Sequence, residues 1–528
     1  MKPLAIDYAF HYERLDAFFS GNPRSPDAWR KAIARTQAAA HPRAGICTVL
    51  AAQQERRGAS AAARASARAL ADGTTVAILT GQQAGAFGGP LFTLLKALTA
   101  IRLAEQVTRE HGVPAVPVFW VEAEDHDWNE VKSCHVLDAD LVPHTVSIGD
   151  PEGAHDRPVA RVLLDQAVEG AIARTAELLQ PTEFTQTLLD GLRSTYRVGT
   201  GTAEAFATWL ESVLGDHGLV VYDASDPAAK PLAGHLFVRE LERAGESARA
   251  AASMGDALRA HGYHAQLAPQ DGTVALFSLL DGREPLRCDG DTIRIGDGQA
   301  YSKAALVERA KSQPEAFSPN VMLRPLVQDT LFPTICYVAG PNELAYLGQL
   351  KPVYEAFGVP MPLFYQRLTA TLVDSNTAKF LAKHDFPLQE LRAQDEAALN
   401  ALLASQLPPG VESSIEQAGQ TLRDRMDALA TQVVQIDPTL EGATRSALGR
   451  MEDDLKKLHA KVLQAAKKKD ETLRRQFHHA QAQAFPAGHP QEREIGCIYF
   501  LNKYGPALID RLTQELPLDM GVHWVFTV

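Results

Sequence analysis

Short apolar runs alternate with amphipathic stretches through the first part of the chain. Thr75 to Leu79 and Val116 to Val121 are typical of buried parallel strands. Between them a helix is predicted from Leu91, with its polar residues on the side opposite its apolar ones. The apolar positions are Leu91, Leu94, Leu95, Leu98, Ile101 and Ala104, and the polar positions are Lys96, Arg102, Glu105 and Arg109. Such a strand, helix and strand are almost always right-handed, so their loops meet at the carboxyl edge of a sheet, where ligands bind.

The same pattern returns further along the chain. Gly218 to Asp223, Thr334 to Ala339 and Pro362 to Tyr365 read as further strands, and residues 341–357 read as a helix. The segment from Thr273 to Ile295 instead carries two Asp-Gly pairs, which favour tight hairpin turns. These pairs are Asp281-Gly282 and Asp289-Gly290. We therefore expect an α/β core over residues 1–375, with a small β insertion at about residues 265–300.

Beyond about residue 376 the composition shifts to Ala, Gln, Leu, Lys and Arg. Apolar residues at three- and four-residue spacing predict two long helices that form an antiparallel coiled-coil hairpin about Asp437-Pro438. We expect this helical domain over residues 376–485, and a C-terminal segment, residues 486–528, that returns to the core. Basic residues at 467–469 and 474–475 would either contact phosphates or form a solvated helix face.

Length, charge and cysteine spacing restrict the classes of protein to which the chain can belong. A chain of 528 residues exceeds the size at which one core stops growing, so two or more units are expected. The formal charge of −12 argues against a general nucleic-acid or anionic-membrane partner. No run of about 18 apolar residues occurs, so we expect a cytoplasmic protein. Five cysteines stand singly, without zinc-site or disulfide-scaffold spacing.

The first candidate site is the glycine-rich turn TGQQAGAFGGP, residues 80–90, between a buried strand and a helix. Its glycines allow close approach of the backbone, and the amides of a helix N-terminus favour an anion. The candidate anion- or nucleotide-binding residues are Gly85, Gly88, Gly89 and Pro90, and the candidate substrate-binding residues are Thr80, Gln82 and Gln83. The alternative is a tight turn without a ligand. The turn lacks the Gly-Lys-Ser/Thr ending of a Walker loop.

The second candidate is an acidic segment that directly follows a buried strand. It contains Glu122, Glu124, Asp125, His126, Asp127 and Glu130. Crowded carboxylates raise at least one pKa, and a neighbouring imidazole can share the proton, which suits general-base chemistry on an amine. Asp125, His126 and Asp127 are the candidate catalytic residues, with Glu124 in substrate binding. A solvated acidic loop and a divalent-metal site are the alternatives.

The third candidate is the segment from Leu323 to Val359. Arg324 is suited to a carboxylate or phosphate, and Gln328 and Glu343 are further candidates for substrate binding. Gly340 and Asn342 lie at a predicted helix start and are candidates for anion binding, as is Lys503. A surface arginine and an ordinary helix start are the alternatives. The sequence lacks a Gly-x-Ser-x-Gly elbow, a Cys-x-x-Cys pair and a His-Glu-x-x-His zinc helix.

Together these motifs resemble one known family. The turn at residues 80–90, Glu124 to Asp127, Arg324 to Lys351 and Asn502 to Pro506 look like the cysteine-adding family of bacillithiol biosynthesis, called BshC. The resemblance implies a Rossmann-like core with connective insertions and a helical coiled-coil domain used in homodimerisation. It also implies a ligase that joins the carboxyl group of cysteine to the amine of glucosaminyl-malate.

A carboxylate is a poor acyl donor, so we expect ATP-dependent activation before the amine attacks. In that scheme the turn and the Gly340 helix start bind anionic groups, a residue among 125–127 accepts the amine proton, and Arg324 binds a carboxylate. The His-x-Gly-His signature of nucleotide-binding synthetases is absent, since Gly85 to Gly89 stands in its place. A noncatalytic small-molecule-binding or assembly protein of the same pathway is the alternative, and a metal-dependent hydrolase ranks below it.

Overall fold

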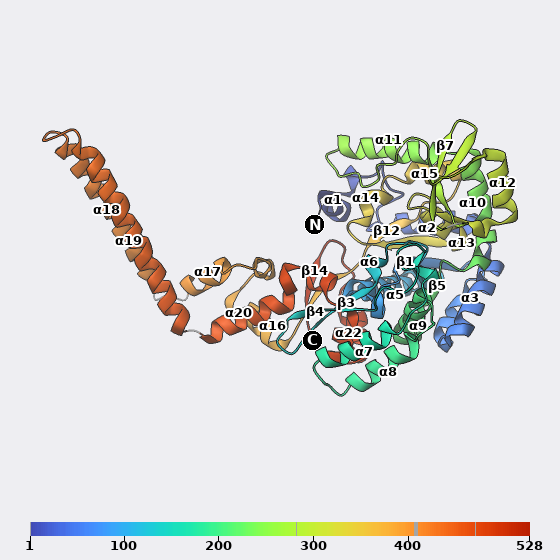
Figure 1. The fold of residues 1–528 in the computed structure, drawn as a ribbon, viewed down its shortest axis with the longest axis horizontal. Helices are drawn as coiled ribbons and strands as arrows, with labels where there is room; N and C mark the ends of the chain where they lie inside the picture. Colours follow the sequence, from blue (N-terminus) through green and yellow to red (C-terminus); the bar gives the residue numbers. More distant parts are fainter. Residues whose placement is uncertain (1, 281, 406–409, 470) are drawn as a thin grey trace. The chain divides into compact units, whose positions relative to one another are not determined.

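The computed structural model describes residues 2–280, 282–405, 410–469 and 471–528, and divides the chain into two compact units (Figure 1). Unit 1 comprises residues up to 371 together with 492–526, and unit 2 comprises residues 372–491 with 527–528. The prediction placed these boundaries after residues 375 and 485. Within the described residues, no helix is both long and apolar enough to cross a membrane.

A five-stranded parallel sheet forms the centre of unit 1. Its order is β12-β11-β1-β2-β5, and β1 pairs with both β11 and β2 in parallel register. The strands are β1 Val76–Gln83, β2 Ala115–Glu122, β5 Val220–Asp223, β11 Thr334–Ala339 and β12 Leu363–Gln366. From β1 the chain builds outward to β2 and β5, and then returns to add β11 and β12 on the other side. The order therefore reverses between β1 and β11, and such a switch point opens a crevice at the carboxyl edge.

The helices of unit 1 surround this sheet. Helix α5, Leu91–His111, packs against β1, β2 and β11, while α9 packs against β5 and α2 against β11 and β12. The remaining bounds are α1 Pro3–Phe10, α2 Pro26–Ala38, α3 Arg43–Arg57, α4 Ala61–Ala69, α6 Trp128–Val131, α7 Ala167–Leu178, α8 Thr185–Thr195, α9 Thr202–Leu214, α10 Lys230–Glu242, α11 Glu246–Ala260, α12 Lys303–Ser312, α13 Arg324–Leu331, α14 Glu343–Leu347, α15 Lys351–Phe357, α22 Cys497–Tyr504 and α23 Ala507–Glu515. Two further pairs of short strands are β3 Ser133–Leu137 with β4 Pro143–Ser147, and β13 Thr369–Val373 with β14 His523–Thr527.

Two sequence predictions differ from these elements. The prediction that Lys96 lies on a polar side of α5 is wrong. Lys96 is only 2% exposed, because α5 is covered on nearly all sides along its first three turns. The single helix predicted over residues 341–357 is two helices, α14 and α15, which are separated at Gly348–Leu350.

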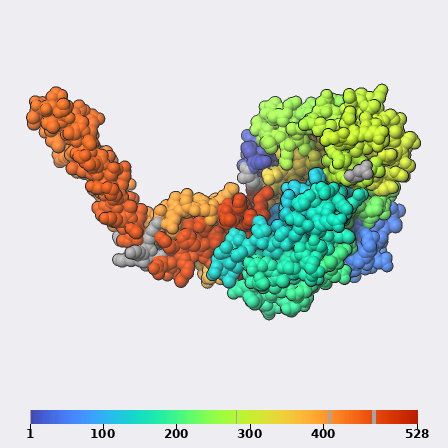
Figure 2. Space-filling model, viewed as in Figure 1, coloured from blue at the N-terminus to red at the C-terminus, as the bar shows by residue number. Residues whose placement is uncertain are grey.

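A second, antiparallel sheet follows the predicted β insertion. Its order is β10-β6-β7-β8-β9, with strands β6 Thr273–Ser278, β7 Glu284–Asp289, β8 Thr292–Ile295, β9 Ala300–Ser302 and β10 Phe317–Pro319. The sheet extends to residue 319 because β10 returns after α12 to pair with β6. The predicted turn at residues 289–290 joins β7 to β8, whereas Asp281 lies outside the described residues. Figure 2 shows this part of unit 1, in yellow-green, lying against the cyan segment after β2.

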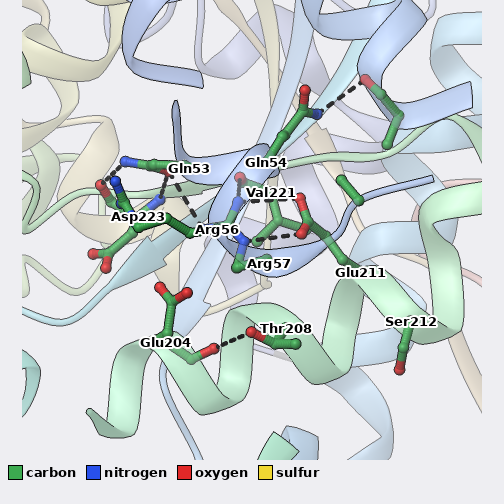
Figure 3. Close-up of polar contacts among 12 residues, drawn as sticks. Gln53, Gln54, Arg56, Arg57, Glu204, Thr208, Glu211, Ser212, Val221 and Asp223 are labelled. Carbon is green, nitrogen blue, oxygen red and sulfur yellow. Dashed lines mark hydrogen bonds and ion pairs between the residues drawn. The ribbon is translucent and has the colours of Figure 1, made fainter. Parts of the chain in front are cut away.

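A buried ion-pair network fixes the end of β5 (Figure 3). The Arg57 guanidinium donates two hydrogen bonds to Glu211, at 2.9 and 3.1 Å, and one to the Val221 carbonyl. Gln53 accepts a hydrogen bond from the Asp223 amide and donates to the Asp223 carbonyl. Because an unpaired buried charge is costly, the Arg57–Glu211 pair is retained, and the network holds the end of β5 against α3 and α9.

Unit 2 is helical. Its helices are α16 Ser375–His384, α17 Ala397–Ser405, α18 Val411–Val433, α19 Leu440–Lys469 and α20 Glu471–Ala484. Helices α18 and α19 lie side by side in Figure 1, and Arg423 pairs with Glu452 while Glu412 pairs with His459. The pairs run in opposite directions along the two helices, as the predicted antiparallel hairpin requires. The side chains of residues 467–469, for which a phosphate contact was one reading, lie outside the described residues.

The predicted fold class is confirmed: an α/β core with a parallel sheet is combined with a helical coiled-coil hairpin. Around the base of the hairpin, α16, α17 and α20 form a separate small core that includes Phe380, Leu402 and Phe477.

Stability is expected to depend on pH through Glu240 in α10. The side chain is fully buried, accepts hydrogen bonds from Ser247 Oγ and the Ala275 amide, and burial raises its pKa from 4.5 to about 7. Between these two values the folded state holds a proton that the unfolded state has released. The free energy of unfolding should therefore fall by about 3 kcal/mol as the pH rises through this window.

Glu240→Gln should accept the Ala275 amide through Oε1, donate from Nε2 to Ser247 Oγ, and flatten this part of the pH profile, as measured by urea unfolding at several pH values between 4.5 and 8. Parallel profiles for the two proteins would contradict a raised pKa at Glu240.

Candidate functional site

The switch point between β1 and β11 is crossed by a buried ion pair. Lys96 Nζ, from α5, lies 2.6 Å from Glu343 Oε2, at the start of α14 after β11. Lys96 also donates to the Gly81 carbonyl at 2.8 Å and to Gln82 Oε1 at 3.4 Å. The side chain of Lys96 thus ties the end of β1 to the loop after β11. Sequence reasoning missed Lys96, although a lysine among the leucines of α5 was a usable signal.

Glu343 anchors the loop that follows β11. Its Oε2 accepts the Gly340 amide at 2.6 Å, and its Oε1 accepts the Tyr337 hydroxyl at 3.1 Å. Burial alone would raise the pKa of Glu343, but the Lys96 ion pair and the Gly340 hydrogen bond lower it below its usual value. Glu343 is therefore a carboxylate, and the Gly340 amide that was predicted to bind an anion already binds this one.

Arg324 lies beside the end of β2. Its guanidinium is 3.8 Å from Glu122 Oε2, within 6.0 Å of the rings of Trp120 and Tyr337, and donates to Gln328 Oε1 at 3.1 Å. The side chain is 14% exposed, so part of it stays open to a ligand. Burial raises the pKa of Glu122, so this carboxyl holds a proton more readily than an exposed one.

Asp125 receives donors from three segments. Gln83 Nε2 donates to Oδ2 at 3.3 Å, and the His126 amide donates to Oδ1 at 2.8 Å. Arg283, just before β7 of the second sheet, donates to Oδ1 at 3.3 Å, and its Nη1 also lies 3.3 Å from His126 Nδ1. The Arg283 guanidinium stacks on the Phe277 ring at 3.7 Å. Sequence reasoning missed Arg283, because no local pattern places that hairpin against β2.

Glu124 turns away from Asp125 into the protein. Its Oε1 pairs with Lys230 Nζ at 2.5 Å, and its Oε2 accepts the Ser318 hydroxyl at 2.9 Å. Lys230 begins α10 and Ser318 belongs to β10, so this carboxylate joins three elements. Asp127 caps the short helix α6 by accepting a hydrogen bond from the Glu130 amide at 3.3 Å.

The glycine-rich turn faces a different part of unit 1. The amides of Gly85, Gly88 and Gly89 donate to the Gln83 carbonyl, the Tyr196 hydroxyl and the Ala86 carbonyl, respectively. Gly88 has φ of 88°, and a side chain there would overlap Trp209. All three amides are thus used within the fold.

The residues around the turn are engaged as well. Pro90 bridges to Gly496 ahead of α22, and the buried Thr80 hydroxyl donates to the Val338 carbonyl at 3.0 Å. Lys503 lies on α22, with its ammonium near the rings of Tyr499 and Tyr504. Asn342 precedes α14 without a side-chain cap to it.

The structure therefore brings together part of the predicted site. The residues that meet at the carboxyl edge are Gln82, Gln83, Asp125, His126, Arg324, Gln328, Gly340 and Glu343, joined by Lys96 and Arg283. Their paired charges suit a polar, anionic small molecule that exchanges for one partner of each pair. Among the described residues, no group of three or more His, Cys, Asp or Glu side chains is arranged to hold a metal ion.

Comparison with known proteins gives a consistent match along the chain. Residues 1–368 match the family described as "Bacillithiol biosynthesis BshC, N-terminal Rossmann-like domain", and residues 370–528 match the corresponding "C-terminal coiled-coil domain". A protein of Salinibacter ruber named "Putative cysteine ligase BshC" is 35% identical, over 99% of this chain and 96% of its own length. Proteins of the same name from Koribacter versatilis and Symbiobacterium thermophilum are 33% and 34% identical, over 97% and 91% of this chain and 94% and 88% of their own lengths.

The Lys96–Glu343 pair provides a test of this geometry. Glu343→Gln should lower the free energy of unfolding by about 3–5 kcal/mol, because it leaves the Lys96 ammonium buried without a counter-charge. The double variant Lys96→Met/Glu343→Gln should recover much of that loss. Denaturant unfolding of the parent, both single variants and the double variant measures the coupling. A coupling energy near zero would show that the two side chains do not interact.

Proposed function

We propose that this chain, which belongs to the bacillithiol biosynthesis BshC family, is a ligase. The proposed reaction joins the carboxyl group of cysteine to the amine of glucosaminyl-malate. The matched family covers both units, and the relatives that carry the ligase name align along nearly the whole chain. The observation that supports the site is the meeting of Gln83, Asp125 and Arg283 within a few residues of the switch point.

In the proposed reaction the amine nitrogen forms a bond to the cysteinyl carbonyl carbon. The bond from that carbon to its leaving group breaks, and the nitrogen loses a proton. Activation by ATP supplies the leaving group, because a free carboxylate is a poor acyl donor. Holding both substrates in reacting geometry is worth about 7–11 kcal/mol of barrier.

The side chains at the edge fit distinct parts of this reaction. Asp125 is the proposed proton acceptor, since it is 36% exposed and is oriented by Gln83 and Arg283. His126 lies beside it as the second acceptor of the proton. Arg324 is the proposed partner of the malyl carboxylate, because its side chain is partly exposed and its guanidinium faces a carboxyl with a raised pKa.

Nucleotide binding, as proposed here, does not use the glycine amides, since their hydrogen bonds are made within the fold. The cationic groups that flank the switch point are Lys96 and Arg324. We place the phosphates of ATP near Lys96, whose present partner, Glu343, is a carboxylate that phosphate oxygens resemble as acceptors. Arg324 remains the proposed partner of the malyl carboxylate.

The direct test incubates the pure protein with ATP, cysteine and glucosaminyl-malate and detects the thiol product by mass spectrometry. Product should require all three. Asp125→Asn should lower kcat by about 100-fold or more, the usual contribution of a positioned general base.

Asp190→Asn, an exposed aspartate on α8, is the matched control and should keep full activity. Normal turnover by a folded Asp125→Asn protein would remove Asp125 from the chemistry. Binding of glucosaminyl-malate without turnover under any nucleotide would favour a substrate-presenting protein over a ligase.

A further inference from the structure

A cavity of about 300 Å³ opens at the carboxyl ends of β2 and β5, on the side of the sheet away from the switch point. Its wall includes Glu124, Arg161, Lys230, Leu279 and Glu315. Unlike the edge around Asp125, it is formed by α10, the loop after β5 and the segment that leads into η3, Val159–Arg161. The Ala160 and Val159 amides donate to the Ala123 and Asp125 carbonyls at 2.8 Å, so this segment runs along the acidic segment.

The floor of the cavity carries buried charge. Glu124 and Lys230 are each 6% exposed, and their ion pair removes two charged groups from water. Among the described residues, Lys230 Nζ contacts the Glu124 carboxylate and the Phe237 ring at 6.0 Å. An ammonium has three N–H donors, so Lys230 has donors left for a further acceptor. A buried ion pair of this kind is a costly choice for stability alone, since apolar side chains often serve as well.

The rim of the cavity adds one cationic and one anionic side chain to the buried pair, and its wall adds an apolar side chain. Arg161 and Glu315 are exposed at the opening, and Leu279 is buried in the wall. The cavity thus offers two cationic groups, two carboxylates and an apolar surface. A volume of about 300 Å³ is at the lower limit for ligand pockets and suits a molecule of amino-acid size rather than a nucleotide.

We infer that this cavity is the subsite for a free α-amino acid, and that cysteine is the amino acid bound there; this inference rests on the proposed ligase function. The carboxylate of the ligand interacts with Lys230 and Arg161, its ammonium with Glu124 and Glu315, and its side chain lies against Leu279. Because Glu124 and Asp125 are consecutive, the cavity and the proposed proton acceptor belong to the same segment after β2.

The test measures binding of L-cysteine to the full chain under reducing conditions by titration calorimetry, without ATP or glucosaminyl-malate. Cysteamine, which lacks the carboxylate, and 3-mercaptopropionate, which lacks the ammonium, should each bind at least tenfold more weakly. Arg161→Ala should weaken L-cysteine binding by about tenfold, since it removes one charge-assisted contact. Lys230→Met/Glu124→Gln, which removes both buried charges together, should abolish binding.

Arg174→Ala on α7, an exposed arginine paired with Glu177, is the matched control and should leave binding unchanged. Thermal unfolding checks that the double variant folds, and Arg161→Ala tests the proposal independently of that result. Unchanged L-cysteine affinity in Arg161→Ala and in the folded double variant would overturn the inference.

The two proposals fail separately. If product forms but the KM for cysteine is the same in Arg161→Ala as in the parent, the subsite is wrong and the ligase function stands. If L-cysteine binds in a cavity-dependent way and no amide product forms with ATP and glucosaminyl-malate, the ligase function is wrong and the subsite stands.

Discussion

A charged side chain that is removed from water needs a partner, and the carboxyl edge of the parallel sheet depends on this constraint. Lys96 with Glu343, Lys230 with Glu124 and Arg283 with Asp125 each join elements that are distant in the sequence. Without these pairs the loops after β1, β2 and β11 would present single buried charges. With them, the loops are held in one arrangement, and each of these six charged groups has an exchangeable partner.

Exchange of partners is the proposed chemical use of this edge. An anionic substrate can replace a carboxylate in its contact with a lysine or arginine, and the released carboxylate is then free to accept a proton. The two ends of the carboxyl edge differ in the charges that they present. The switch point presents cations near β1 and β11, whereas the cavity beside β5 presents both signs of charge around a small volume. In the proposed reaction, the anionic amine substrate and the zwitterionic amino acid therefore bind at separate places along one edge.

The sequence predicted the elements whose signal is local. The strands β1, β2 and β11 and the helix α5 follow from apolar runs and helical spacing, and the contact of Gln83 with Asp125 follows from parallel strands that end together. The residues it missed act across long separations: Arg283 reaches Asp125 from the second sheet, and Lys230 reaches Glu124 from α10. The glycine turn was interpreted from its composition, which is typical of an anion site. Its packing depends on Tyr196 and Trp209, which are far away in the sequence and which no local pattern indicates.

The most direct test of the proposed site at the carboxyl edge of the parallel sheet is a crystal structure of the protein with glucosaminyl-malate bound. The account predicts the malyl carboxylate beside Arg324 and the amine within hydrogen-bonding distance of Asp125. A ligand seated away from the carboxyl ends of β1 and β2, with the Arg324 and Asp125 contacts unchanged, would contradict it.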